Sequence, residues 1–293
     1  MIPRVAVLLA GFDGQKYLYE QVFSLLNQKR VSVDIFIRVD GDSSIFTDMV
    51  IQLASEFKNI HFLQGDFLSS SGMNFYRLII GMQDKTFDFY ALCDQDDIWE
   101  DTKLQRAVEC LTDKSVSGYS SGFTTFNSTG MKKRHSNGQQ SKFDHFFQSS
   151  GPGCTFVFDR TGFIFLQEYL LENQELLSVL AHDWLIYFVF RFNNIGWRID
   201  SESHLLYRQH SSNVAGVNSG FGAKIKRAKL LFSGWYISDL LLLMSFARRR
   251  GFTPRFFSPL QLRRSKAQSI FIWLYYWLFV KNRLECEFNS EST

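Results

Sequence analysis

The sequence predicts an α/β fold in which a central, mostly parallel sheet is flanked by helices on both faces. Short apolar runs rich in β-branched residues alternate with segments whose apolar residues recur at helical spacing. The first run, residues 5–10, is apolar throughout, as expected for a strand buried on both faces. Three of them lead directly into small or acidic residues, at the strand ends where such sheets bind ligands.

The first half of the chain gives the clearest succession of elements. Leu18, Val22 and Leu25 show the spacing of a helix with one buried face. The predicted strands are residues 5–10, 33–39, 60–63 and 87–93, and the helices between them are residues 15–28, 46–57 and 73–82.

The second half is less regular. Residues 115–142 are rich in Ser, Gly, Asn and Lys, so we expect loops with short strands. Further predicted elements are a strand at 155–158, helices at 162–171 and 180–192, and two short strands at 197–199 and 205–207. From residue 221 onward the pattern is helical, basic and apolar.

Charge divides the chain into two unequal parts. Residues 221–266 contain eleven of the 32 basic residues and, of the 29 acidic ones, only Asp239, so the rest of the chain has a net charge of −7. We therefore expect a ligand-binding domain over residues 1–216 and a basic, aromatic helical extension over residues 217–293.

Cysteine usage indicates a reducing compartment. The four cysteines form no Cys-x-x-Cys pair, which argues against a zinc site or a disulfide framework. The first residues lead straight into a strand-like run and lack the features of a signal peptide. No stretch reaches the roughly 18 apolar residues of a spanning helix. We therefore expect a cytoplasmic protein.

An acidic run follows the fourth predicted strand. It contains Asp94, Asp96 and Asp97, and carboxylates crowded in this way repel one another unless a cation is present. Oxygen ligands suit Mg²⁺ or Mn²⁺, which can bridge a diphosphate and stabilise a leaving group. The alternative is an acidic turn before the helix that begins near Asp101, but the position at a strand end favours a metal site.

The run, Cys-Asp-Gln-Asp-Asp-Ile-Trp, resembles the family 2 glycosyltransferases, whose GT-A fold has a D-x-D motif after its fourth strand. The resemblance covers about residues 3–216 and is strongest for bacterial rhamnosyltransferases of polysaccharide and O-antigen assembly. It implies that Asp96 binds the metal and that Asp94 lies beside the nucleotide. Asp97 is expected at the diphosphate and acceptor pocket.

The same resemblance implies a nucleotide site. Ala10 and Phe12 stand where the family has a T-Y-N-G-like sequence, so Phe12 is expected to stack near the base, although an ordinary turn is an alternative. Asp40 is expected to accept from the imide N–H of uracil or thymine, but Val39 replaces the first of two acids common in the family. Asn74 either contacts the nucleotide or starts a helix.

The reacting end is expected further along the chain. By resemblance Gly153 and Cys154 line the sugar and acceptor pocket, although glycines serve any tight turn. Asp183 is expected to be the general base that takes the acceptor proton, because attack needs a carboxylate opposite the leaving group. His182 is the alternative base, and Trp184 is expected to form an apolar wall of the pocket.

A Tyr-Arg-Gln-His sequence ends the last predicted strand and also matches the resembling group. Arg208 is expected near the diphosphate, and neutral His210 is expected to complete the metal shell. A structural role for this histidine is the alternative.

Residues 270–280 are intensely apolar and aromatic, but too few to span a bilayer. Beside basic clusters, such a helix is typical of an interfacial anchor on an anionic membrane, here the inner face of the cell membrane. The alternatives are docking on the first domain and a homodimer interface. No nucleic-acid-binding motif is present, and the acidic first part would oppose such a partner.

The sequence thus favours an inverting glycosyltransferase that acts on a lipid-linked saccharide in polysaccharide synthesis. The resemblance favours dTDP-rhamnose as donor, and UDP-linked sugars stay open. A nucleotidyltransferase would need a Gly-rich loop with several basic residues after the first strand, where only Lys16 is found. A non-catalytic sugar-nucleotide-binding or scaffold protein would be expected to lack Asp96 or Asp183.

Overall fold

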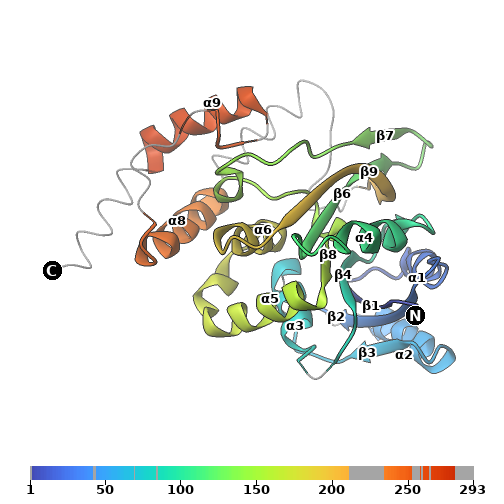
Figure 1. Cartoon of the computed structure of the whole chain (residues 1–293). Coiled ribbons are helices and arrows are strands. Elements are labelled where there is room, and N and C mark those ends of the chain that lie inside the picture. The colour runs from blue at the N-terminus through green and yellow to red at the C-terminus, as the bar shows by residue number, and fades with distance from the viewer. Residues whose placement is uncertain are drawn as a thin grey trace.

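One sheet runs through the molecule, with helices on both of its faces (Figure 1). The structure is a computed structural model that describes residues 2–41, 44–68, 70–83, 85–210, 234–252, 258, 260–263 and 265–280. The expected α/β class is therefore confirmed.

The first half forms a parallel sheet with strand order β3-β2-β1-β4. Its strands are β1 (Arg4–Gly11), β2 (Ser32–Val39), β3 (Ile60–Leu63) and β4 (Phe89–Asp94). The helices between them are α1 (Leu18–Leu26), α2 (Ser44–Glu56) and α3 (Ser71–Ile80). Every strand and helix predicted for this half is present, with ends shifted by a few residues.

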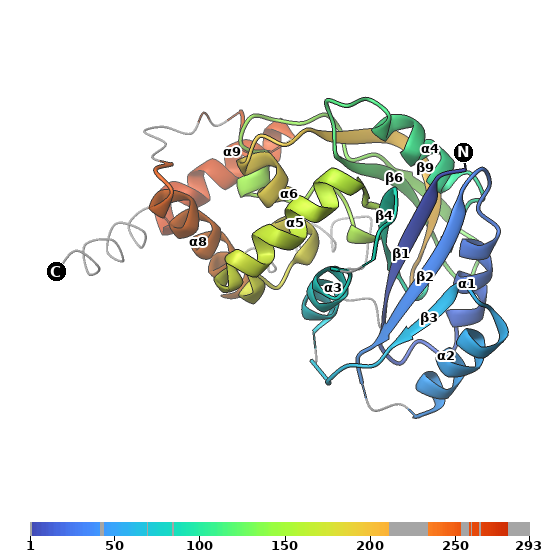
Figure 2. The same cartoon turned by 60° about the horizontal axis from the view of Figure 1, so that its bottom comes forward.

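Strand β1 is buried on both faces, which explains its unbroken apolar sequence. Val7 and Leu9 point into a core shared with α1, α2 and α4 (Lys103–Leu111). Ala6 and Leu8 point into the opposite core, shared with α3, α5 (Arg160–Glu172) and α6 (His182–Phe192). Figure 2 shows α1 and α2 on one side of the sheet and α3 and α5 on the other.

The second half of the sheet mixes parallel and antiparallel pairs. β8 (Val157–Asp159) lies antiparallel between β4 and β6 (Gly118–Phe126), and β9 (Trp197–Arg208) lies parallel to β6. The remaining strands are β5 (Ile98–Trp99) and β7 (Lys132–His135), and short 3-10 helices lie at η1 (Asp144–Phe146), η2 (Gly153–Thr155) and η3 (Gln174–Ser178). A mostly parallel arrangement therefore holds only for the first four strands.

Two predictions for this half were only partly right. The segment expected to be loops with short strands contains the short strand β7, but also the nine-residue strand β6, which pairs with three strands. The two short strands predicted after residue 196 are parts of one strand, β9. Ser120 and Ser121 are buried in β6, yet each has a hydrogen-bond partner: Trp197 Nε1 donates to Ser120 Oγ, and Ser121 Oγ donates to a main-chain carbonyl. Ser120 thus depends on a partner distant in sequence, and Ser121 on the carbonyl of the next residue, Gly122, so both polar side chains can lie inside.

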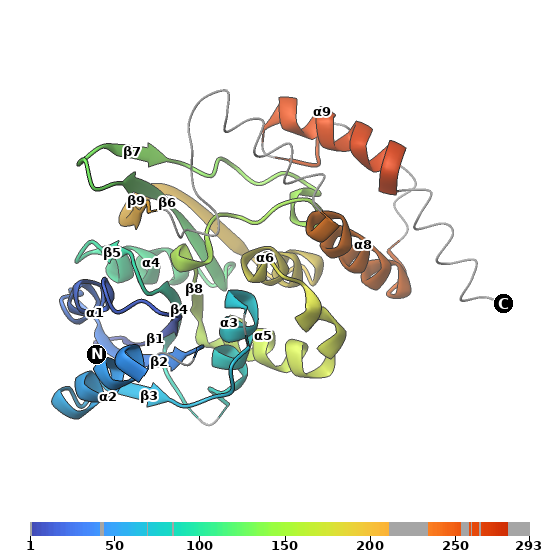
Figure 3. The same ribbon diagram turned by 180° about the vertical axis from the view of Figure 1, so that it is seen from behind.

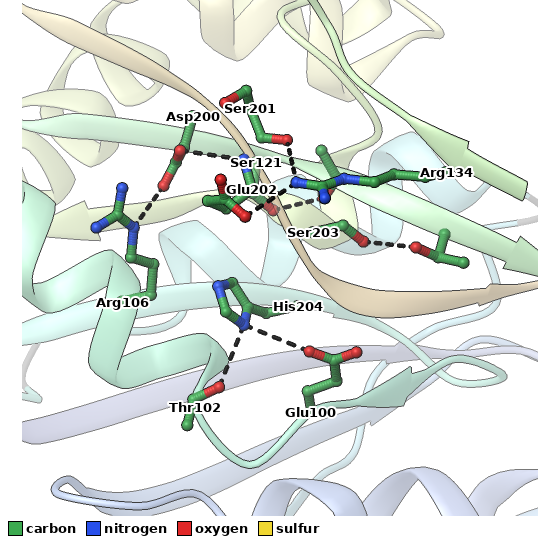
Figure 4. Close-up of polar contacts among 12 residues, drawn as sticks. Glu100, Thr102, Arg106, Ser121, Arg134, Asp200, Ser201, Glu202, Ser203 and His204 are labelled. Atoms are coloured by element: carbon green, nitrogen blue, oxygen red, sulfur yellow. Dashed lines mark hydrogen bonds and ion pairs between the residues drawn. The ribbon is translucent and has the colours of Figure 1, made fainter.

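Side chains of β9 also bind the elements on either side (Figure 4). Asp200 accepts from Arg106 of α4 over 2.7 Å, and Glu202 pairs with Arg134 of β7. The register of β9 against β6 shifts twice in this region. These contacts compensate for main-chain pairs lost at the irregularity.

The C-terminal part packs on the rest of the molecule through α8 (Gly234–Arg249) and α9 (Lys266–Tyr275), which continues as a π-helical turn (Tyr276–Val280). Figures 1 and 3 place both helices on the α6 side, away from α1 and α2. Trp184 of α6 stacks on Tyr236 of α8, with ring centroids 5.1 Å apart. The core thus crosses the boundary expected at residue 216.

Much of the expected basic extension, including residues 224–229, lies outside the described residues, as does the sequence just after His210. Within the described ranges every helix falls short of the length and hydropathy that crossing a bilayer requires.

Leu240→Ala should lower the free energy of unfolding by about 2–5 kcal/mol, because it opens a cavity in the core between α6 and α8. Denaturant unfolding of the purified protein measures this. Leu260→Ala is the control, since that side chain is 52% exposed and should change stability little. Equal stability of the two variants would mean that α8 does not share the core.

Candidate active site

The candidate site lies where β1, β2 and β4 end. β1 lies between β2 and β4, so the chain crosses from one side of β1 to the other at this point, and a crevice is expected beyond the strand ends. Ala10 pairs with Asp94 across the two strands. The turn after β1 and the acidic run after β4 are therefore neighbours.

Gln95 joins these two loops. Its amide oxygen accepts from the Phe12 N–H and its amide nitrogen donates to the Phe12 carbonyl, over 2.5 and 2.6 Å. The Phe12 side chain is 55% exposed beside them, so its ring is available to a ligand. The sequence predicted no role for Gln95, since the middle position of a D-x-D motif has no fixed chemistry.

Asp40 and Asn74 both lie buried at the end of β2, and both bind main chain. Asp40 accepts from the N–H groups of Leu68 and Ser70. Asn74, in the first turn of α3, donates to the Gly11 carbonyl and accepts from Arg38. These contacts fix the loops around the expected nucleotide site.

The acidic run lies against Cys154, a residue of η2. Ligand atoms of Asp94, Asp97 and Cys154 lie within 4.8 Å of one another. Burial, followed by the charge of Asp96, raises the pKa of Asp94 from 3.8 to about 7. Burial and the charges of Asp94 and Asp96 raise the pKa of Asp97 well above its usual range. The group therefore binds protons, or a cation, readily.

Lys103 lies beneath this run and was not predicted. It is 1% exposed, its Nζ lies 3.4 Å from the centre of the Trp99 ring, and burial lowers its pKa to about 8. Among the described residues neither its Nζ nor the Asp97 Oδ2 has a hydrogen-bond partner. The charge of Asp97 favours the protonated amine, so Lys103 offsets part of the crowded negative charge.

Asp96 meets His210 although 114 residues separate them. The His210 Nε2 lies 2.7 Å from the Asp96 Oδ2, which places a carboxylate and an imidazole at one point. A cavity of about 400 Å³ opens beside them, and Lys16, Tyr17, Asn127, Ser128, Arg208, Gln209 and His210 line it.

Arg208 holds this arrangement in place. Its main-chain N–H donates to Asp97, its Nε donates to the Asp96 carbonyl, and its guanidinium pairs with Glu20. The guanidinium also lies over the rings of Tyr17 and Phe126, 4.5 Å from each centroid. It therefore fixes the acidic run as well as lining the cavity.

The start of α6 lies near the acidic run. Asp183 is close enough that its charge raises the pKa of Asp94. Burial raises the pKa of Asp183 itself to about 6, against hydrogen bonds from Trp184 N–H and Ser149 that lower it. A carboxyl of this kind is mostly ionised at pH 7 yet holds a proton better than an ordinary aspartate.

His182 and Trp184, on either side of Asp183, are tied into the protein. His182 stacks on Phe75, and burial lowers its pKa to about 3, so it stays neutral. A side chain at Gly153 would come within 2.3 Å of the His182 Nε2, so this position needs glycine. Trp184 is 3% exposed in the core, and its indole N–H donates to the His145 carbonyl.

The residues present fit a divalent cation. The buried Asp97 Oδ2, without a hydrogen-bond partner among the described residues, is an acceptor for a cation or a proton. Asp96 and His210 add a second carboxylate and a nitrogen, all ligand types that Mg²⁺ or Mn²⁺ accepts.

Comparison with known proteins gives consistent matches. The family described as "Glycosyltransferase like family 2" matches residues 3–127. The dTDP-rhamnosyl transferase RfbG of Shigella flexneri is 33% identical over 286 residues, covering 91% of this chain and 98% of that protein. An uncharacterized glycosyltransferase of Nostoc sp. is 26% identical over 115 residues, or 39% of this chain and 35% of the relative.

Among solved structures, S. aureus TarS in complex with UDP-GlcNAc is similar with a TM-score of 0.55 at 12% identity, over 91% of this chain and 69% of that chain. At this identity the likeness shows the fold alone.

The stability that Asp94 and Asp183 contribute to the metal-free protein should fall as the pH rises from about 4 to about 7.5, whereas the buried His182, with its pKa lowered to about 3, acts in the opposite direction. Asp94 and Asp183 have pKa values of about 7 and about 6 in the folded state, above the ordinary 3.8. The stability that these two groups contribute is fully present below pH ~4 and is lost as the pH rises through their pKa values in the folded state. Thermal unfolding in a chelator measures this trend.

The stability difference between the parent and Asp94→Asn should therefore fall over this range, whereas the difference between the parent and Asp48→Asn, at an exposed carboxylate of α2, should stay constant. A stability difference between the parent and Asp94→Asn that stays constant or grows over this range would contradict the prediction.

Proposed function

The chain belongs to the family 2 glycosyltransferases, and from this premise we propose an inverting transfer of rhamnose from dTDP-rhamnose to a lipid-linked saccharide. The observation that supports an active enzyme most strongly is the meeting of distant segments at one site. Asp96 contacts His210, Cys154 closes on Asp94, and Asp183 lies close enough to influence Asp94.

In the proposed reaction the turn after β1 holds the nucleoside, with Phe12 against the base and Asp40 next to it. The acidic run and Arg208 face the diphosphate. Asp96 and His210 would hold Mg²⁺ or Mn²⁺, which would stabilise negative charge on the departing diphosphate.

Asp183 is the proposed general base. It takes the proton from an acceptor hydroxyl while that oxygen attacks the anomeric carbon. The bond from this carbon to the diphosphate oxygen breaks, and the nucleoside diphosphate leaves on the opposite side, which inverts the anomeric configuration. Its pKa of about 6 suits this role at neutral pH. Burial and the low pKa of His182 favour the carboxylate over the imidazole.

The choice of rhamnose rests on the relative RfbG, which matches nearly the full length of both chains. A uracil base would present the same imide N–H to Asp40, so a UDP-linked hexose is the alternative donor.

We also propose that α9 contacts the cytoplasmic face of the cell membrane, where a lipid-linked acceptor would be found. Ile272 and Tyr275 face the core of the protein. On the outer face, 44% to 67% of each of four apolar side chains is exposed, and these are Ile270, Phe271, Leu274 and Leu278. Such a face beside Lys266 and the other basic residues of the extension suits the interface of an anionic bilayer.

A panel of nucleotide sugars tests the donor and the base together. The parent should turn over dTDP-rhamnose fastest in Mn²⁺ or Mg²⁺ and lose activity in EDTA. Asp183→Asn should keep donor binding and lose about 100-fold or more in transfer, as expected when general base catalysis is removed.

Asp113→Asn, at a fully exposed carboxylate, is the matched control and should transfer at the parent rate. Parent-like turnover by Asp183→Asn would exclude Asp183 as the base. Faster turnover of a UDP-sugar than of dTDP-rhamnose would mean that the donor is UDP-linked. Binding of a nucleotide sugar without any turnover would favour a non-catalytic protein.

Replacing Phe271 and Leu274 together by Glu should release the protein from vesicles that contain anionic lipid, as measured by co-sedimentation. The charges would have to enter the membrane interface, at a high desolvation cost. Ile51→Glu, at a 48% exposed residue of α2, should bind like the parent. Undiminished binding by the double variant would exclude this face, and a parent dimer that the double variant converts to a monomer would indicate a dimer interface instead.

A further inference from the structure

Asp239 is the single acidic residue in the basic stretch of residues 221–266, and it lies inside the protein. It belongs to α8 and is 3% exposed. A buried carboxylate is costly unless hydrogen bonds compensate for its lost hydration. Its partners therefore indicate what the residue is for.

The partners are main-chain groups at the start of α6, the helix that carries Asp183. The Leu180 N–H lies 3.2 Å from both carboxylate oxygens, and the Ala181 N–H lies 3.3 Å from one of them. Ala181 occupies the N-cap position of α6, and its side chain cannot accept a hydrogen bond. A capping side chain at position 181 would accept from N–H groups further along α6 and would leave the Ala181 N–H unpaired. The Asp239 carboxylate, which comes from another helix, accepts from this N–H group.

Helix α3 holds the same loop from the other side. The Tyr76 hydroxyl donates to the Val179 carbonyl over 2.9 Å. A side chain at Gly72 would come within 2.6 Å of the Leu180 carbonyl oxygen, so the main chain passes directly against α3. Residues 179–181 are therefore clamped between α3 and α8, immediately before Asp183.

From this geometry we infer that Asp239 is a positioning residue, which fixes the start of α6 so that Asp183 faces the acidic run after β4. The inference rests on the role proposed above for Asp183 as the base. It assigns the C-terminal extension a part in the active site, in addition to any contact with a membrane. Asp239 itself touches neither donor nor acceptor in this proposal.

Electrostatics agrees with the geometry. Burial is the main cause of the raised pKa of Asp183, and the charge of Asp239 adds to it. The hydrogen bonds from Leu180 and Ala181 lower the pKa of Asp239, against the larger effect of burial. The two carboxylates are thus close enough to influence each other without sharing a hydrogen-bond donor.

The test compares Asp239→Asn with Tyr236→Phe on the same helix. The first variant puts an amide N–H opposite a main-chain N–H and weakens the clamp. The second removes the buried hydrogen bond from the Tyr236 hydroxyl to the Phe147 carbonyl and keeps the ring that stacks on Trp184. Each variant weakens the buried polar contacts of one side chain of α8, so similar losses of thermal stability are expected.

Asp239→Asn should lower kcat by about 10- to 100-fold, the loss that a misplaced catalytic group produces. The KM for the donor should stay within about twofold, because the nucleotide site lies on β1, β2 and β4. Tyr236→Phe should keep the parent kcat. A kcat for Asp239→Asn that matches Tyr236→Phe at equal stability would overturn the inference.

Two further measurements separate this inference from the proposed function. In the Asp183→Asn background, Asp239→Asn should cause no additional loss, since it acts through Asp183; a full additional loss would overturn the inference while leaving Asp183 as the base. Hydrogen exchange of a peptide spanning residues 176–186 needs no substrate. Asp239→Asn should lose protection there and Tyr236→Phe should not, whichever sugar, if any, the parent transfers.

Discussion

The crowding of three carboxylates at the end of β4 is the constraint around which this site is built. Asp94, Asp96 and Asp97 cannot all be ionised in a partly buried place without compensation. The fold supplies it from distant segments, through the Arg208 N–H on Asp97 and the His210 ring on Asp96. The carboxylates need positive charge, hydrogen-bond donors or protons nearby. For this reason the residues at the end of β9 lie against the acidic run that follows β4.

The same constraint connects the site with the helical side of the molecule. Cys154 closes the acidic run from η2, and Gly153 beside it allows His182 to pack closely. Helix α6 is in turn held by α3 and α8, whose side chains bind the main chain before it. The candidate base therefore depends on helices at both ends of the sequence, which agrees with a core shared by α6 and α8.

Sequence patterns predicted the elements whose burial is two-sided and apolar. The four strands of the first half follow this rule, because an apolar β-branched run has few other stable places. The length of strand β6 was underestimated because Ser120 and Ser121 look like loop residues, and their burial depends on hydrogen bonds with Trp197 and a main-chain carbonyl. Gln95 was missed because its partner, Phe12, is 83 residues away in the chain. Lys103 was missed because a lysine at the start of a helix gives no sign in the sequence that it is buried.

The sequence by itself determined the α/β class of the fold and the family, and it pointed to most of the residues at the candidate site. Short motifs at strand ends consist of residues that are neighbours in the chain, so they can be recognised in the sequence without the structure. Tertiary structure alone decided that Gln95 binds Phe12, that Trp184 is a core residue, and that Asp239 binds the main chain just before α6. These contacts join segments far apart in the chain, and their energies depend on burial and charge, which exist only once the chain is folded.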